Sequence, residues 1–401
     1  MTDFVTLEAE SARTENRGFL VPYFELQIDG SGLPGNVLRD VTEFTYRDSL
    51  TEIDQFEVSV ANWDSETRRF KYIGSETSGD LARPDAANLP FKLFEPCRKS
   101  VSVVMGYVGN PVTMMTGNFT TMEPSFPQTG APVLTVRGLN ALHELRRKKY
   151  STAWVGKSPS FIARNIGQLT DGGSRRFSAS VEIVPGTENG EAAIPYVAQT
   201  SQYEIDFLLN FARQYGYELT LIGERGNRTI RFGRASEARL PVNYALSWGR
   251  ALVEFKPTLT TAGQFKSITV RGWDRTRQRP IEARIAFDDP ALRGLNRDMH
   301  EMIIECDPRE EESVQLPVFS QADARARAIA IMRDSGASII KATGTTIGLP
   351  DLRSGTKIRI DDLGARLSGE YMVTKTTHTI NDTGYTTKFE ARREHFTGVE
   401  R

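Results

Sequence analysis

The sequence has few cysteines and histidines, and it has no long apolar run. Its two cysteines, Cys97 and Cys306, are too few for a disulfide framework and lack the paired spacing of a structural zinc site. No segment approaches the ~20 uninterrupted apolar residues of a transmembrane helix, and the acidic N-terminus has no signal-peptide run. These features predict a protein that folds in a reducing cytoplasm, without membrane insertion or a cleaved signal.

The chain also lacks an excess of charge of either sign. Its 401 residues include 50 lysines and arginines against 51 aspartates and glutamates, so the net charge favours neither nucleic acid nor an anionic membrane as partner. We therefore expect protein partners. A chain of this length exceeds the size at which one hydrophobic core stops growing, which predicts two or three domains.

Catalytic and metal-binding patterns are missing as well. The four histidines stand at no helical or hairpin metal-ligand spacing: His143, His300, His378 and His395. There is no Gly-x-Ser-x-Gly turn and no phosphate-binding GxxxxGK[ST] loop. The sequence therefore predicts no catalytic residue, no cofactor or cofactor-binding residue, and no metal ligand.

Two acidic groups remain as candidates for the paired carboxylates of a glycan hydrolase. The first, ECDPREEE, lies around Pro308 in a predicted loop and holds Glu305, Asp307, Glu310, Glu311 and Glu312. We interpret it as a solvated acidic turn, or as a patch that faces a basic partner surface. The second, Asp361 with Asp362, is expected in a turn between strands, where aspartate bonds its own backbone.

A run of four basic residues, Arg146 to Lys149, has an aromatic neighbour only in Tyr150 and Trp154. Nucleic-acid binding would need more interleaved aromatic side chains, so we interpret the run as an exposed helix end. We also hypothesise that this run meets the acidic segment Glu305 to Glu312 across a subunit boundary.

Short alternating stretches separated by glycine, proline and asparagine predict a first β-barrel or sandwich over about residues 18–140. Its strands are expected at Val21 to Ile28, Phe56 to Val60, Phe91 to Leu93, Val101 to Val108, Met114 to Met122 and Val133 to Arg137.

Helix signals indicate a small α/β domain over about residues 150–240. Ser158 before Pro159 predicts the start of one helix, with Gly172 and Gly173 as its stop. Ser201 and Glu204 have capping-box spacing and predict a second helix, which ends before Gly216 and is followed by a hairpin over residues 217–232.

Strand patterning returns after residue 245 and predicts a second β-domain. A helix from Ser320 to Asp334 interrupts it, with a capping box at Ser320 and Asp323 and its end at Gly336. The strands are expected at Leu252 to Phe255, Ser267 to Trp273, Ile281 to Phe287, Ile339 to Thr346, Lys357 to Ile360, Tyr371 to Ile380 and Tyr385 to Ala391.

Three segments carry a resemblance to a known family. The segment Leu352 to Arg393 has a Ser-Gly-Glu-Tyr turn leading into Val373, then His378, and Gly384-Tyr385 before the last strand. With VRGLNALHELRRKK at Val136 to Lys149 and the helix segment Ala198 to Leu219, it resembles the phage late control protein D family. That family includes baseplate hubs of contractile tails and injection systems and the hub part of the type VI valine-glycine repeat protein G.

The resemblance implies a homotrimeric structural hub, which joins a hexameric inner tube to a trimeric spike and contacts other baseplate proteins. The spike is expected to be a separate polypeptide, since the chain ends after the last hub strand. The implied hub is assembled in the cytoplasm and is found in a virion or a released particle. An adhesion or carbohydrate-binding module and a cell-wall hydrolase remain as alternatives.

The predicted fold is mainly β with an α+β insert: two β-barrel-like hub domains flanking a small α/β domain. The domains are expected at residues 1–145, 146–245 and 246–401. Subunit contacts are assigned to the barrels, and tube contacts to turn-rich loops on one rim. The loops expected to make contacts are Gly30 to Asn36, Gly109 to Thr113 and Phe126 to Pro132.

Overall fold

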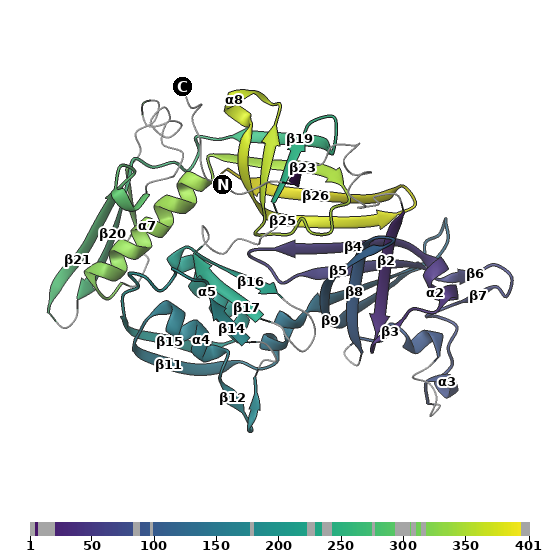
Figure 1. Ribbon diagram of the computed structural model, residues 1–401. Coiled ribbons are helices and arrows are strands. Elements are labelled where there is room, and N and C mark those ends of the chain that lie inside the picture. The colour runs from purple at the N-terminus through teal and green to yellow at the C-terminus, as the bar shows by residue number, and fades with distance from the viewer. Residues whose placement is uncertain are drawn as a thin grey trace.

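The fold is strand-rich, with a few helices (Figure 1). The computed structural model describes residues 5–6, 21–82, 89–96, 99–176, 180–222, 229–234, 243–274, 277–292, 305, 310–313 and 318–393. Cys97, Cys306, Asp307, His300 and His395 lie outside these residues. The predicted mainly β class is confirmed, whereas closure of the sheets into barrels stays a prediction.

One large sheet connects the two ends of the chain. In the described residues it has 14 strands, and its path runs β1-β18-β24-β25-β4-β5-β10-β9-β8-β2-β3, with β26, β23 and β19 attached beside β25. The N-terminal and C-terminal strands meet where β4 pairs antiparallel with β25, with Tyr46 opposite His378. We call this β4–β25 pairing the seam.

The N-terminal half of the large sheet packs around an aromatic core. Phe44, Phe56 and Phe119 are buried in it, and Ile380 and Tyr385 reach it from the C-terminal strands. Alternation of buried and partly buried residues along β5 and β10 explains why these segments form strands with one face on the core. The elements are β2 (Pro22–Ile28), β3 (Ser31–Gly32), α2 (Gly35–Asp40), β4 (Val41–Ser49), β5 (Gln55–Ala61), β6 (Trp63–Asp64), β7 (Arg69–Phe70), α3 (Ser78–Ala82), η2 (Pro90–Lys92), β8 (Ser100–Tyr107), β9 (Asn110–Ser125), β10 (Val133–Asn140) and η3 (Ala141–Arg146).

The C-terminal half of the sheet has its own core, in which Ile358, Ile360 and Tyr371 are fully buried. The N-terminal strand β1 (Val5–Thr6) pairs with β18 of this half. The other strands are β18 (Asn243–Ser247), β19 (Leu252–Leu259), β23 (Ile340–Ile347), β24 (Lys357–Asp361), β25 (Gly369–Asn381) and β26 (Gly384–Arg392), with the short helix α8 (Gly364–Leu367) before β25.

A smaller layer lies to one side of the C-terminal sheet, where α7 covers a three-stranded sheet (Figure 1). Its core joins Ile268, Val270 and Ile285 of the strands to Ala324 and Ala328 of the helix. Ser320 caps α7 through a 3.1 Å hydrogen bond donated by the Asp323 amide, as predicted. The elements are β20 (Ser267–Asp274), β21 (Arg279–Ala286), η4 (Pro290–Leu292), β22 (Glu310–Ser313) and α7 (Gln321–Ala337).

The insert between the two halves is an α/β unit. Helices α4 and α5 pack with the β11–β15 ribbon and the β14-β17-β16 sheet around Trp154, Ile205 and Phe232. The predicted cap of Ser158 on α4 and the hairpin of β16 with β17 are confirmed. The elements are β11 (Tyr150–Lys157), α4 (Pro159–Ile166), β12 (Thr170–Asp171), β13 (Ser174–Arg175), β14 (Ser180–Ile183), β15 (Ile194–Gln202), α5 (Glu204–Tyr215), β16 (Tyr217–Ile222) and β17 (Thr229–Arg234).

The capping box predicted at Ser201 is wrong. Ser201 belongs to strand β15, and its amide donates to the hydroxyl of Ser151 at 3.1 Å. The carboxylate of Glu204 forms a buried ion pair with Arg176 at 2.7 Å. Helix α5 therefore begins at Glu204. It ends before Gly216, as predicted, and the φ of +66° at Gly216 permits a left-handed cap.

Three other local predictions are also wrong. Phe91 to Leu93 is not a strand, because Pro90 begins the 3₁₀ helix η2 there. Helix α4 ends at Ile166, well before Gly172, which instead turns between β12 and β13. Gly336 does not stop α7, since it is a buried residue of the helix, which continues to Ala337.

Candidate interaction surfaces

A buried ion pair joins the two halves of the large sheet at the seam. The Arg353 guanidinium donates to the Asp48 carboxylate at 2.7 Å, and the Asp48 side chain is 4% exposed. The Ser354 amide and the Thr376 hydroxyl also donate to Asp48, and Arg353 contacts the Tyr46 hydroxyl. A buried carboxylate is tolerated when its oxygens are satisfied in this way, so these residues fix the register of the seam.

His378 lies at the centre of the same cluster and is fully buried. Its Nε2 is 3.0 Å from the Leu352 carbonyl, which can only accept, so Nε2 carries the proton. Its Nδ1 accepts from the hydroxyl of Tyr385 at 3.0 Å or of Thr387 at 3.1 Å. Burial lowers the pKa of His378 to about 3, so the ring is neutral. His378, one of the residues on which the sequence resemblance rests, is thus buried within the core.

Asp54 adds a second carboxyl group beside the cluster. The Asn140 amide donates to it at 2.8 Å. Burial, and next the negative charge of Asp48, raise its pKa to about 7, while Arg353 opposes this shift. The seam therefore contains two groups, Asp54 and His378, whose burial disfavours the charged form.

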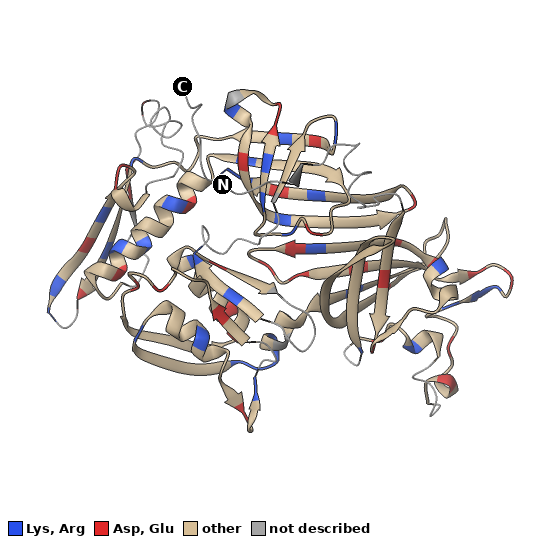
Figure 2. Ribbon diagram, in the orientation of Figure 1, with Lys and Arg blue, Asp and Glu red and all other residues tan. Residues whose placement is uncertain are grey.

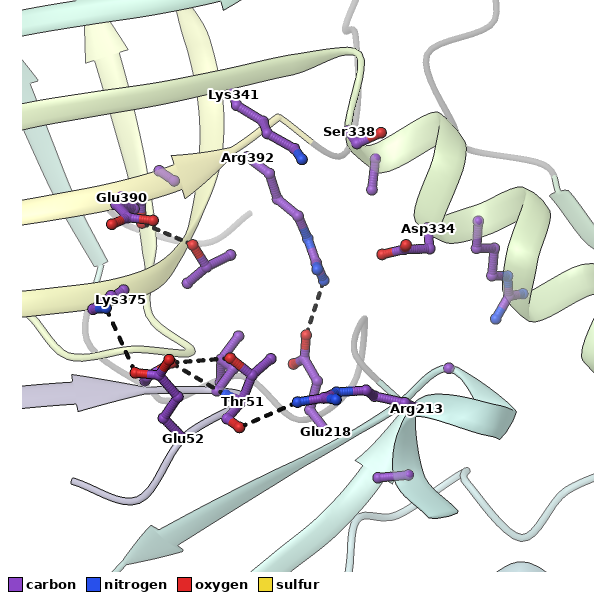
Figure 3. Close-up of a pocket in the computed structure, with 18 of the residues that line it drawn as sticks. Thr51, Glu52, Arg213, Glu218, Asp334, Ser338, Lys341, Lys375, Glu390 and Arg392 are labelled. Carbon is purple, nitrogen blue, oxygen red and sulfur yellow. Dashed lines mark hydrogen bonds and ion pairs between the residues drawn. The ribbon is translucent and has the colours of Figure 1, made fainter. Parts of the chain in front are cut away.

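A cleft of about 1100 Å³ lies between the insert, α7 and the C-terminal sheet. Figure 3 shows Arg392 of β26 reaching across it toward Glu218 of β16, to which it donates at 2.8 Å. Close to Glu218 in the same view, Arg213 of α5 donates to the Thr51 carbonyl at 3.4 Å. The insert is thus connected to the sheet by polar contacts at the edge of a large opening.

The basic run lies at the exposed end of η3, as predicted. Arg146 pairs with Asp206 at 2.8 Å, and Lys148 pairs with Asp171 at 3.0 Å. The amine of Lys149 lies 5.3 Å from the ring centre of Tyr203. The run is therefore held against the insert by its own ion pairs.

The acidic segment is a strand over part of its length, and there the loop prediction is wrong. Glu310 to Ser313 forms β22, which pairs parallel with β20. Arg284 of β21 pairs with Glu310 at 2.7 Å and so offsets the poor strand propensity of glutamate. The structure does not bring the acidic and basic runs together within the chain, since β20 and β12 lie well apart (Figures 1 and 2).

The structure places Asp361 and Asp362 in different elements. Asp361 ends β24, where Arg359 donates to it at 3.1 Å. Asp362 follows in a turn with φ of +66°, as aspartate tolerates.

In the described ranges, no three His, Cys, Asp or Glu side chains are grouped to hold a metal ion. No helix within these ranges is long and apolar enough to cross a membrane.

The three loops expected to make contacts do not share one rim. Strands β2 and β8 are antiparallel, with Ile28 opposite Val101. The predicted loop Gly30 to Asn36 therefore lies at one end of this pair, and the β8–β9 turn at Val108 and Gly109 lies at the other. The loop prediction is wrong for Asn110 to Thr113, which belong to β9. Phe126 to Pro132 follows the far end of β9, away from that turn.

The sequence interpretation missed Asp48 and Arg353. A signal for Asp48 was present, because it continues the inward positions of Phe44 and Tyr46 along β4, where an apolar residue is expected. No comparable signal marks Arg353, which follows a buried leucine outside any strand.

Comparisons with known proteins place this fold among tail proteins. A family model described as the Alg8 N-terminal domain matches residues 79–382. No curated protein matches the sequence. A prophage tail protein from Shewanella oneidensis is 17% identical with a TM-score of 0.63, and the match covers 93% of this chain and 98% of that chain.

Two further solved structures agree. A tail protein from Neisseria meningitidis is 13% identical with a TM-score of 0.61, over 93% of this chain and 97% of that one. A component of the E. coli type VI secretion system is 12% identical with a TM-score of 0.53, over 94% of this chain and 79% of that one, and is described as similar to tail proteins of bacteriophage T4. The predicted resemblance to tail and injection-system proteins is confirmed at the level of the fold.

Proposed function

This chain belongs to the Alg8 N-terminal domain family, and from its likeness in fold to prophage tail proteins we propose that it is a structural baseplate hub of a contractile tail or injection system. The observation that carries this proposal is the likeness in fold, which extends over nearly the whole chain of each tail protein. Function within a shared fold depends on surfaces and sites, so the proposal needs a direct test.

The proposed hub is a homotrimer that adapts a hexameric tube to a trimeric spike. Each chain supplies two strand-rich halves with separate cores, joined by the seam, so three chains present six such halves. We propose residues 1–145 and 246–401 as the two hub domains and residues 146–245 as the insert.

We propose a structural role and not catalysis. In the described part of the acidic segment, Glu310 is engaged by Arg284 and lies on an edge strand, away from the large cleft. The titratable groups with the largest shifts, such as His378, lie within the core, where they support the seam.

The mass of the purified chain in solution, measured by light scattering with and without its tail-tube protein, tests the proposal. We expect a trimer that binds tube hexamers. A chain that stays monomeric with the tube protein present would contradict the hub function.

One observation favours the alternative of a carbohydrate-binding module. Trp273 is half exposed on β20 and lies two positions from Arg271, which pairs with Glu282 at 3.1 Å. An aromatic face beside charged hydrogen-bonding groups suits a sugar ring. Binding on a glycan array that is lost in Trp273→Ala would support this alternative, and a silent array would count against it.

A further inference from the structure

The edge strand β22 has an unusual composition. It begins with three consecutive glutamates, Glu310 to Glu312, although glutamate is depleted in strands. The sheet order β21-β20-β22 leaves the outer side of β22 without a partner strand among the described residues. In that part of the chain Glu310 pairs with Arg284, whereas Glu311 is exposed and has no ion pair. We call Glu310 to Glu312 the acidic edge.

A basic patch lies elsewhere, on the insert. Lys148 pairs with Asp171 of β12, and the neighbouring strand β13 adds the exposed Arg175. With the exposed Lys149, which follows Lys148 in the chain, we group these cations as the basic patch: Lys148, Lys149 and Arg175. Among the described residues, Lys149 and Arg175 have no carboxylate partner, so the patch keeps positive charge.

Opposite charges on separate parts of one chain point to a contact between chains. Figure 2 shows the β12 hairpin and the β20–β21 sheet in different regions of the molecule, so one chain cannot join the two surfaces. A ring of identical subunits is closed by contacts between two different patches. We propose that the acidic edge of one chain contacts the basic patch of a second copy, an inference that rests on the proposed trimeric function.

A simpler explanation is that the glutamates protect the edge strand from aggregation. Charged side chains on an edge discourage further strand pairing. That protection does not depend on the sign of the charge, so lysines at the same positions would serve as well. A contact with a basic patch does depend on the sign, and this difference separates the two explanations.

The expected contact has an electrostatic signature. Exposed ion pairs are individually weak and are screened by salt, with a Debye length of about 10 Å at 0.1 M. The association of the trimer should therefore weaken as sodium chloride is raised. Charges at an interface also set which surfaces recognise one another.

The test reverses charge on the full-length chain and measures mass by light scattering over a salt series. The acidic-edge variant is Glu311→Lys with Glu312→Lys, which spares the pair of Glu310 with Arg284. The basic-patch variant is Lys149→Glu with Arg175→Glu, which spares the pair of Lys148 with Asp171. A third variant combines all four substitutions.

We expect each double variant to associate at least tenfold more weakly than the wild type, and the combined variant to regain association to within about threefold. The matched control reverses two exposed cations of the β6–β7 hairpin, Arg68→Glu with Arg69→Glu, and should remain a trimer. Circular dichroism confirms that each variant is folded.

Three results would overturn the inference. Double variants that form trimers with the wild-type salt dependence would show that the contact lies elsewhere, and would leave the hub function intact. Trimers that instead lose tube binding would assign the charged surfaces to the tube protein. A wild type that is monomeric even with the tube protein would reject both the contact and the hub function.

Discussion

The seam and the cleft both join segments that are far apart in the sequence, but they do so by different physical means. At the seam, β4 and β25 share a hydrogen-bonded ladder over an ion pair whose Asp48 carboxylate is buried and also accepts from the Ser354 amide and the Thr376 hydroxyl. At the cleft, the insert meets the sheet across an opening of about 1100 Å³, through pairs such as Arg392 with Glu218.

This difference predicts how the molecule responds to damage. A buried charge that loses its partner is costly, because no water replaces the lost interaction. The Arg392–Glu218 pair is similarly shielded, but it lies beside a large opening that water can enter, so its loss should cost less. We therefore expect the two sheet halves to unfold together and the insert to open more easily.

The largest effect is expected from Arg353→Met. This change leaves the Asp48 carboxylate buried without its cation, and should lower the free energy of unfolding by about 3 to 5 kcal/mol. Urea denaturation measures it. The matched control is Arg359→Met, which breaks an exposed pair with Asp361 and should cost about 0 to 1 kcal/mol. Equal losses in the two variants would refute the view that the seam depends on a buried charge pair.

The pH dependence of stability should reveal two opposing groups at the seam. His378 has a pKa of about 3 in the folded chain against an ordinary 6.5, so its contribution lowers stability as the pH falls from 6.5 to 3. Asp54 has a folded pKa of about 7 against an ordinary 3.8, so its contribution raises stability as the pH falls from 7 to 3.8. The changes in stability with pH that these two groups contribute largely cancel between about pH 4 and 6.5.

Replacing one of the two groups should reveal the pH dependence of stability that the other group contributes. Each pKa unit corresponds to about 1.4 kcal/mol, so the curves should differ from the wild type by roughly 2 kcal/mol or more near pH 4. His378→Gln should become more stable on acidification than the wild type does, and Asp54→Asn less stable. Thermal melts from pH 4 to 8 provide the measurement. Two variants that both follow the wild-type curve would show that neither group titrates with a shifted pKa.

Gly117→Ala should test whether damage in one half of the sheet reaches the other. A Cβ at Gly117 in β9 would overlap the Leu139 carbonyl oxygen in β10, so the two backbones must move apart. This separation should lower the free energy of unfolding by about 1 to 3 kcal/mol. Hydrogen exchange should then rise in β23 to β26 as well as in β8 to β10. The control Gly35→Ala enters open space and should change stability by less than about 0.5 kcal/mol. Faster exchange confined to β8 to β10 would mean that the seam does not couple the halves.

The sequence predicted those parts of the fold that depend on neighbouring residues. Periodicity located most strands, and the caps at Ser158 and Ser320 were correct because a cap acts within one helical turn. The capping box predicted at Ser201 is wrong because the Glu204 carboxylate forms an ion pair with Arg176. The spacing of residues in the sequence does not reveal that partner. Strand pairing across the seam, between β4 and β25, was likewise not predictable from local pattern.

The candidate surfaces were only partly predictable, for the same reason. Composition identified the basic run and the acidic segment, because charge is visible in the sequence itself. The strand at Glu310 depends on its pairing with β20 and on Arg284, and both are tertiary features. The buried Asp48 and the half-buried Arg353 are about 300 residues apart, so their pairing appears only in the structure.

The smallest effect is expected at the cleft, from Arg392→Met. The Arg392 and Glu218 side chains are 20% and 9% exposed, close to the values of the seam pair, but they lie beside a large opening that water can enter. Removing this ion pair should therefore cost about 1 kcal/mol of global stability. Its local effect should be larger, because this pair connects β26 to the insert strand β16. Hydrogen exchange should therefore accelerate in β16 and α5 while β4 and β25 stay protected.

Lys375→Met, which breaks the longer 3.5 Å pair with Glu52 on the same cleft, serves as the control and should leave exchange in the insert unchanged. If Arg392→Met instead accelerates exchange equally across the seam, the insert and the sheet unfold as one unit, and the contrast between seam and cleft does not hold.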